Sequence, residues 1–129
     1  MSDSNIESAV KSVEELLHEI RNSSTEINFD DVIATIKKNY HYTPTCFKNG
    51  LTENSVLNAA GQNEGSCRIF YFARLNNLSE AEALSCFGRF YREDVLGNPD
   101  GNDHMNIRNF MKDGWAGIVF EGEALRCIQ

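Results

Sequence analysis

The residue best suited to covalent chemistry in this sequence is Cys67, which follows a polar, glycine-containing loop at residues 58–66. An apolar run begins directly after this cysteine, which predicts a helix over residues 66–76 with Ser66 as its N-cap. A thiol in the first turn of a helix has a lowered pKa, because the helix dipole and free N–H groups stabilise the thiolate. The sequence therefore offers Cys67 as a candidate nucleophile.

A nucleophilic cysteine needs a base and a group that orients the base. His104 is the candidate base, and Asn106 or Asn109 could hold its imidazole in place. The alternative is that Cys67 is a small residue that packs into the core at the start of its helix. Cys67 and His104 are thus catalytic candidates, and neither is a firm assignment.

A second group of residues has the chemistry of a metal site. Glu93 and Asp94 stand on one side of a glycine- and asparagine-rich loop, and Asp103 and His104 stand on the other. Carboxylates and imidazole are ligands for hard or borderline divalent cations. The alternative is that Asp103 caps a helix and that Glu93 and Asp94 form a solvated face. A divalent metal is the one cofactor that these residues suggest, and no other cofactor is expected.

The interpretation favoured for a site is a polar pocket without covalent chemistry. Polar side chains are dense in three loops or helix starts, at residues 58–66, 98–103 and 106–109. If these segments converge, they form one pocket that is rich in amides and poor in charge. The candidate ligand-binding residues are Gln62, Asn63, Ser66, Arg92, Asn106, Arg108 and Asn109.

An anion site is a related alternative. It would use the backbone N–H groups of residues 61–66 together with Arg68 and Arg108. The glycine and lysine spacing does not match a nucleotide-binding fingerprint. The class of anion therefore stays open.

The elements that must position these residues are mostly helical. Apolar periodicity and capping residues predict helices over residues 5–21, 29–39, 66–76, 79–96 and 103–113, an extended segment over 40–47 and a strand over 115–120. Asn28 or Asp30 caps the second of these helices, Ser79 and Glu82 form a capping box at the start of the fourth, and their buried faces include Phe29 and Phe90. Residues 48–50 read as a turn, residues 52–58 as a polar loop, and the tail from Glu121 has no firm pattern. We expect one domain over residues 1–129 of class α+β, mostly α, with about five helices and a small β-hairpin or short two-stranded sheet.

The first predicted helix carries an apolar stripe that needs a partner. Val10, Val13, Leu17 and Ile20 fall on one face, opposite a row of charged side chains. Either the domain core or another chain must cover this face. A protein-binding role for the helix at residues 5–21 therefore remains open.

Composition narrows the classes of partner. The net charge of −7 and pI near 4.9 argue against a nucleic-acid groove or an anionic membrane surface. No stretch approaches the about 20 apolar residues of a membrane span, and the N-terminus lacks the pattern of a secretory signal peptide. The four cysteines are far apart in sequence, which favours reduced cysteines in a cytosolic-type protein over a structural zinc site.

The order of several short motifs resembles the HopJ (HopPmaJ) type III effector family. These motifs are Tyr42-Thr43-Pro44-Thr45, Asn58-Ala59-Ala60-Gly61-Gln62-Asn63, Cys86-Phe87-Gly88, Tyr91-Arg92-Glu93-Asp94-Val95-Leu96, Asp103-His104, Asn106-Ile107-Arg108-Asn109-Phe110-Met111 and Gly114-Trp115. The resemblance covers residues 28–125, so residues 1–25 form an N-terminal helical extension to this family core.

The resemblance implies a bacterial effector that type III secretion delivers into host cells, with a host protein as its partner. No enzymatic activity or catalytic residue comes with the resemblance. We therefore expect an effector that acts by protein interaction. The alternative is a protein of the bacterial cytoplasm that binds a small ligand or metal, or a hydrolase-like enzyme, using the Gln62, Cys67 and His104 region. The sequence leaves the oligomeric state open.

Overall fold

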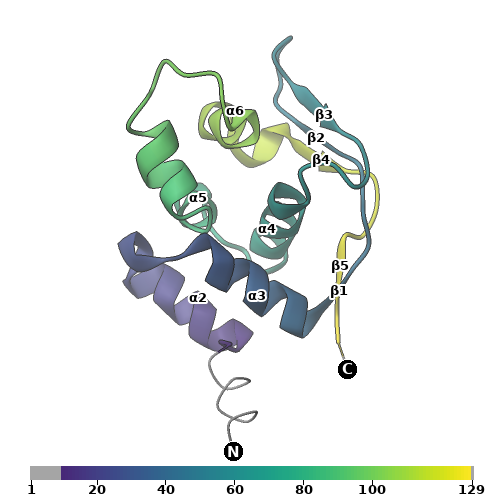
Figure 1. The fold of residues 1–129 in the computed structure, drawn as a ribbon. Coiled ribbons are helices and arrows are strands. Elements are labelled where there is room, and N and C mark those ends of the chain that lie inside the picture. The colour runs from purple at the N-terminus through teal and green to yellow at the C-terminus, as the bar shows by residue number, and fades with distance from the viewer. Residues whose placement is uncertain (1–9, 129) are drawn as a thin grey trace, which may run out of the picture.

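The computed structural model describes residues 10–128 and has the predicted α+β class. Helix α4 (Glu64–Leu75) occupies the centre of the fold, with the other helices around one side of it and two small sheets on the other (Figure 1). No helix of the described residues is long and apolar enough to cross a membrane.

Helix α4 has the central, buried position that its apolar composition predicts. The ring of Phe70 lies 4.8 Å from the Phe110 ring and 5.2 Å from the Phe87 ring, measured between centroids. The predicted start of the helix was wrong, because α4 begins at Glu64 and its N-cap is Asn63 instead of Ser66. Asn63 adopts a left-handed conformation with φ of 52°, which asparagine tolerates better than most residues.

The first described helix, α2 (Val13–Asn22), is shorter than predicted. Ser12 and Glu15 form a capping box at its start, and residue 10 lies in a bend, so no helix runs through residues 10–12. The predicted residues 5–9 lie outside the described part of the chain. Leu16 and Ile20 are buried in the domain core, which means that this part of the apolar stripe has its partner within the chain.

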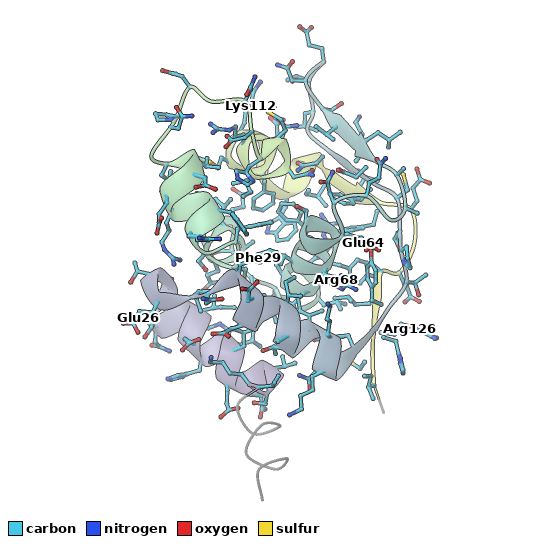
Figure 2. The ribbon with its side chains drawn as sticks, in the orientation of Figure 1. Glu26, Phe29, Glu64, Arg68, Lys112 and Arg126 are labelled. Carbon is cyan, nitrogen blue, oxygen red and sulfur yellow. The ribbon has the colours of Figure 1, made fainter. Side chains whose placement is uncertain are left out.

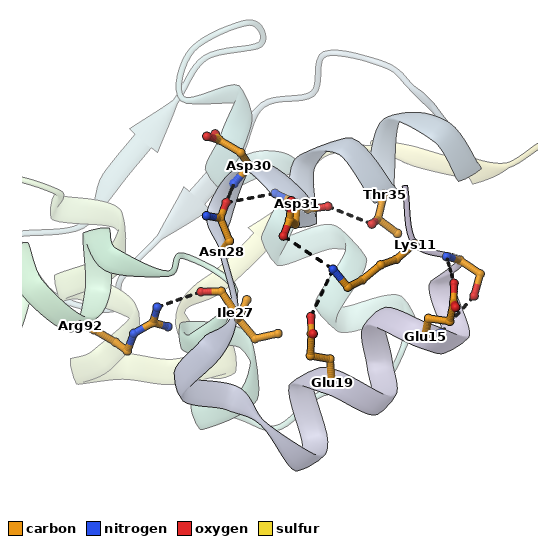
Figure 3. A network of polar contacts seen from close by, with 10 residues as sticks. Lys11, Glu15, Glu19, Ile27, Asn28, Asp30, Asp31, Thr35 and Arg92 are labelled. Atoms are coloured by element: carbon orange, nitrogen blue, oxygen red, sulfur yellow. Dashed lines mark hydrogen bonds and ion pairs between the residues drawn. The ribbon is translucent and has the colours of Figure 1, made fainter. Parts of the chain in front are cut away.

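Helix α3 (Phe29–Asn39) matches the prediction, with Asn28 as its N-cap. It packs against α2, and Lys11 joins the two helices by approaching Glu19 and Asp31 at 3.6 Å each (Figure 3). A short 3-10 helix, η1 (Ser24–Glu26), connects them.

The predicted helix over residues 79–96 is interrupted. Its first part, α5 (Glu80–Ser85), starts with the predicted capping box, and its second part is a π-helical segment, η2 (Phe90–Val95). Gly88 separates them in a left-handed conformation with φ of +59°, and a Cβ there would stand 2.9 Å from the backbone N of Phe29. The positive φ is incompatible with a right-handed helix and interrupts it here, while the close approach to Phe29 leaves no room for a side chain at this position.

Helix α6 (Met105–Asp113) begins after His104 instead of after the predicted cap, Asp103. The carboxylate of Asp103 accepts a hydrogen bond from Arg108 at 2.6 Å and makes no cap hydrogen bond. The chain then passes through a short 3-10 helix, η3 (Gly114–Gly117).

The strands form two antiparallel sheets instead of one hairpin. Strand β1 (Tyr40–Tyr42) pairs with β5 (Leu125–Cys127), and β2 (Phe47–Asn49) lies between β3 (Val56–Asn58) and β4 (Ile118–Phe120). The predicted turn at residues 48–50, the loop at 52–58 and the unpatterned tail were therefore wrong in part, since the first overlaps β2 and the other two contain β3 and β5. Three-residue strands are too short to show their alternation clearly in sequence.

The docking of α2 on its own domain predicts a stability difference between two leucines. Leu16→Ala removes a fully buried side chain and should lower the free energy of unfolding by about 2–5 kcal/mol, as for other core leucines. Leu57→Ala, at a leucine that is 67% exposed, should change it by less than about 0.5 kcal/mol. Urea unfolding measures both, and equal small effects would contradict the docking of α2.

Candidate functional site

Five asparagines form one hydrogen-bonded cluster, the asparagine network, which consists of Asn49, Asn58, Asn63, Asn106 and Asn109. The Oδ1 of Asn106 accepts from Nδ2 of Asn49 at 2.9 Å and from Nδ2 of Asn58 at 3.0 Å. The Oδ1 of Asn58 in turn accepts from Asn106 at 3.0 Å and from Asn63 at 2.7 Å. Asn109 donates to the backbone carbonyl of Asn49 at 3.1 Å.

The asparagine network fixes four elements relative to one another. It joins β2, the end of β3, the residue that caps α4 and the first turn of α6. Asn49, Asn58, Asn106 and Asn109 are buried, so loss of the Asn106 side chain removes one hydrogen bond from Asn49 and two from Asn58 that water cannot readily replace. The consequence is that the first turns of α4 and α6 are held near the same point.

Both of these helix starts lack a side-chain cap. Asn63 before α4 and His104 before α6 have almost the same left-handed conformation, with φ, ψ of 52°, 50° and 51°, 49°. Within residues 10–128, the first intrahelical bonds come from Cys67 and Ile107, so the earlier N–H groups of each helix have no partner. Each start is therefore a set of free donors at the positive end of a helix dipole.

A pocket of about 420 Å³ opens between these two helix starts, and we call it the helix-start pocket. Its polar side consists of Asn63, Ser66, His104 and Asn106, and its apolar side includes Phe29, Val56, Phe87, Phe90 and Ile107. Such a cavity, with apolar walls and a few convergent polar groups, has the usual composition of a small-molecule site.

Phe29, the first residue of α3, lines the pocket, and Figure 2 labels its place between α3 and α4. A glycine at position 65 permits this approach, because a Cβ there would stand only 3.0 Å from Cζ of Phe29. The Phe29 ring also packs edge-to-face on Phe90, with 5.0 Å between the ring centroids. These contacts build the aromatic wall against the first turn of α4.

His104 is held in the pocket wall by the π-helical segment η2. Its Nε2 lies 3.1 Å from Oδ2 of Asp94, and its ring lies 5.4 Å from the ring of Phe90. Asp94 and Phe90 are four residues apart in η2, and π-helical segments are frequent at functional sites. The arrangement leaves a half-buried, oriented imidazole at the pocket.

The structure does not bring Cys67 and His104 together. Cys67 is fully buried outside the pocket lining, with Sγ 3.6 Å from the carbonyl oxygen of Thr45, and no hydrogen bond joins it to His104 in the described chain. Burial raises the pKa of the Cys67 thiol, in the opposite direction from the prediction. The nearby guanidinium of Arg68 lies over the ring of Tyr42 at 3.9 Å and outside the pocket lining.

Two arginines predicted to bind a ligand instead hold loops in place. Arg92 donates to the carbonyl oxygen of Ile27 at 2.9 Å, which joins η2 to the start of α3 (Figure 3). Arg108 donates to the backbone and the carboxylate of Asp103 at 2.6 Å each and to the carbonyl of Pro99 at 3.2 Å. Both guanidinium groups therefore use their donors for hydrogen bonds within the fold.

The four residues of the predicted metal site come together only in part. His104 Nε2 is 3.1 Å from Asp94 and 3.9 Å from Asp103, while the other carboxylate oxygen of Asp103 binds Arg108. The hydrogen bond from Arg108 holds the pKa of Asp103 below its usual value. Among residues 10–128, no group of three or more His, Cys, Asp or Glu side chains is arranged to hold a metal ion.

Sequence reasoning placed some pocket residues and missed others. Of the predicted residues, Asn63, Ser66, His104 and Asn106 line the pocket, whereas Gln62, Cys67, Arg92, Arg108 and Asn109 do not. For the asparagine network, it included Asn58 only as part of the polar segment at residues 58–66 and missed Asn49, and it assigned Phe29 and Phe90 to the core. Asn49 faces inward because burial alternates along β2, and a strand of three residues does not show this alternation in its sequence.

The asparagine network predicts a large effect of one substitution. Asn106→Leu removes the acceptor and donor at the centre of the network and should lower the free energy of unfolding by about 3 kcal/mol, since buried amides lose their partners. Asn102→Leu, at an exposed position in the preceding loop, is the matched control and should change it by less than about 0.5 kcal/mol. Denaturant unfolding measures both, and a loss below about 1 kcal/mol for Asn106→Leu would contradict the role of the network.

Thiol reactivity tests the burial of Cys67 directly. Cys127 is exposed, Cys46 is half-buried, and Cys67 and Cys86 are buried, with the pKa of Cys86 raised to about 12 by burial. In native protein treated with Ellman's reagent at pH 8, one thiol per chain should therefore react rapidly. The Cys127→Ser variant should lose this rapid reaction. Rapid labelling of Cys67, identified by peptide mass spectrometry, would restore it as a candidate nucleophile.

The comparisons with known proteins give one family match and one similar solved structure. The family model of the HopJ type III effector protein matches residues 13–125. A solved crystal structure of an unknown-function protein, VPA0580, is similar over 92% of this chain and 95% of that chain, with 47% identity and a TM-score of 0.86. No curated protein matches this chain. Because this match covers nearly the whole chain, the chain belongs to the HopJ type III effector protein family.

Proposed function

We propose that this chain acts as a type III effector by recognition instead of catalysis, and that the helix-start pocket is a binding site for a small ligand. Its family supports the effector assignment. The observation that carries the binding site is the convergence of two uncapped helix starts on one pocket with aromatic walls. The buried, unactivated Cys67 favours recognition over covalent chemistry.

The lining of the pocket defines the class of ligand. The free N–H groups of the two helix starts and the hydroxyl of Ser66 are donors, and the helix dipoles add positive potential. Phe29, Phe87 and Phe90 offer apolar, flat surface on the other side. We therefore propose a small molecule with a planar apolar body and an anionic or strongly accepting group. The pocket volume of about 420 Å³ is within the range of small-molecule sites.

A nitrogen-15 NMR titration with small aromatic carboxylates, each paired with its neutral primary amide, tests this proposal. The carboxylates should shift the backbone amides of Gly65, Ser66, Met105 and Asn106 in a saturable way, with about tenfold higher affinity than the amides. That ratio corresponds to about 1.4 kcal/mol from the two helix ends.

Two variants with the same change of charge sharpen this test. Ser66→Asp places a carboxylate inside the pocket, at a helix position where aspartate is favourable, and should abolish binding while the fold is retained. Gln62→Glu adds the same charge on the exposed loop outside the lining and should leave affinity within about twofold. Unchanged binding in Ser66→Asp, or carboxylates that shift none of the four amides, would refute the site.

A second candidate function is binding of a partner protein, as expected of an effector that acts by protein interaction. The observation that favours it is the row of large apolar side chains exposed on the sheet, including Leu57 at 67% and Val119 at 56%. Single exposed apolar residues are common, but two large ones on the same sheet, on either side of one lysine, form part of a wider surface that can contact a partner.

A further inference from the structure

Three exposed side chains form a row across the sheet of β3, β2 and β4. The register pairs Lys48 of β2 with Leu57 of β3 on one side and with Val119 of β4 on the other. Paired residues of adjacent strands point to the same face, and all three of these residues are exposed. The outer face of the sheet is therefore apolar at both sides and cationic in the middle.

The apolar surface continues around the outer edge of β4. Val119 also lines a groove of about 600 Å³ between β4 and α4, whose other walls include Tyr71, Arg74 and Leu75. Leu75 is 46% exposed. We call Lys48, Leu57, Leu75 and Val119 the sheet-face patch. It is wide enough to take several side chains of one partner segment.

The charges at the patch are opposite in sign to the net charge of the chain. Lys48 and Arg74 have no carboxylate within ion-pair distance in the described residues, although the chain has a net charge of −7. Nη2 of Arg74 donates to the carbonyl oxygens of Trp115 and Ile118, and the guanidinium lies 5.2 Å from the centroid of the Trp115 ring, which fixes an exposed cation that faces no carboxylate among the described residues. Glu121 and Glu123, which follow β4, are exposed.

These charges disfavour a second copy of the chain as the occupant. A symmetric pair that buried this face would bring the Lys48 side chains of both copies together. An acidic segment meets no such repulsion at the patch itself, because its carboxylates can approach Lys48 and Arg74.

We propose that the sheet-face patch docks an acidic, leucine-rich segment of a partner protein. Apolar side chains of that segment cover Leu57, Val119 and Leu75, and its carboxylates pair with Lys48 and Arg74. This inference rests on the second candidate function, binding of a partner protein, and is independent of the helix-start pocket.

Selection of a random twelve-residue peptide library against the purified chain tests the proposal. The recovered peptides should combine Asp or Glu with Leu, Ile or Phe, and their amide shifts should map to residues 48, 57, 75 and 119. Lys48→Glu and Val119→Ser should each weaken a selected peptide at least tenfold, and Lys48→Glu should select basic peptides instead. Both residues are exposed, so the fold should be retained. Lys112→Glu, the same charge change at an exposed position on α6, should have no effect.

Three results would overturn this proposal. They are recovery of no peptide above background, selected peptides that are insensitive to Lys48→Glu, and concentration-dependent dimers that Val119→Ser abolishes in sedimentation. Peptides that shift residues 65, 66 and 105 instead would show binding at the helix-start pocket and would refute only the sheet-face patch. Loss of carboxylate binding at the pocket, with peptide binding retained, would refute only the pocket.

Discussion

The side-chain amide of Asn106 is the contact on which the arrangement of the site depends. It bonds at once to amides from β2 and from the end of β3, and through Asn58 it reaches Asn63, the residue before α4. An apolar residue could fill the same volume, but it could not set the register between a sheet and two helix starts. Buried amide networks specify one arrangement because each member needs all of its partners.

The two left-handed residues that precede α4 and α6 leave backbone N–H donors free at the same pocket. Asn63 uses its side chain in the network and His104 pairs with Asp94, so neither caps its own helix. The donors that a cap would satisfy stay free and face one pocket. Unusual backbone conformations that converge in this way are typical of binding sites. The aromatic wall and the free donors then define the chemistry that the pocket can recognise.

The features that were predicted correctly from the sequence are those that depend on interactions between residues close in sequence. The Asn28 cap of α3, the Ser79–Glu82 capping box and the burial of α4 depend on residues close in sequence, and they were confirmed. The position of Cys67, the starts of α4 and α6 and the short strands depend on contacts across the chain. Asn49 and Asn106 are 57 positions apart, and a pairing of that kind leaves no periodic pattern in a single sequence.

The most direct test of the account is a crystal structure of the chain soaked with the tightest-binding aromatic carboxylate. The account predicts that the carboxylate lies within hydrogen-bond distance of backbone N–H groups from the first turns of both α4 and α6, with the ring against Phe29 and Phe90. A carboxylate bound elsewhere, or one that contacts a single helix start while the ring faces solvent, would contradict the claim that the asparagine network builds one recognition site from two helices.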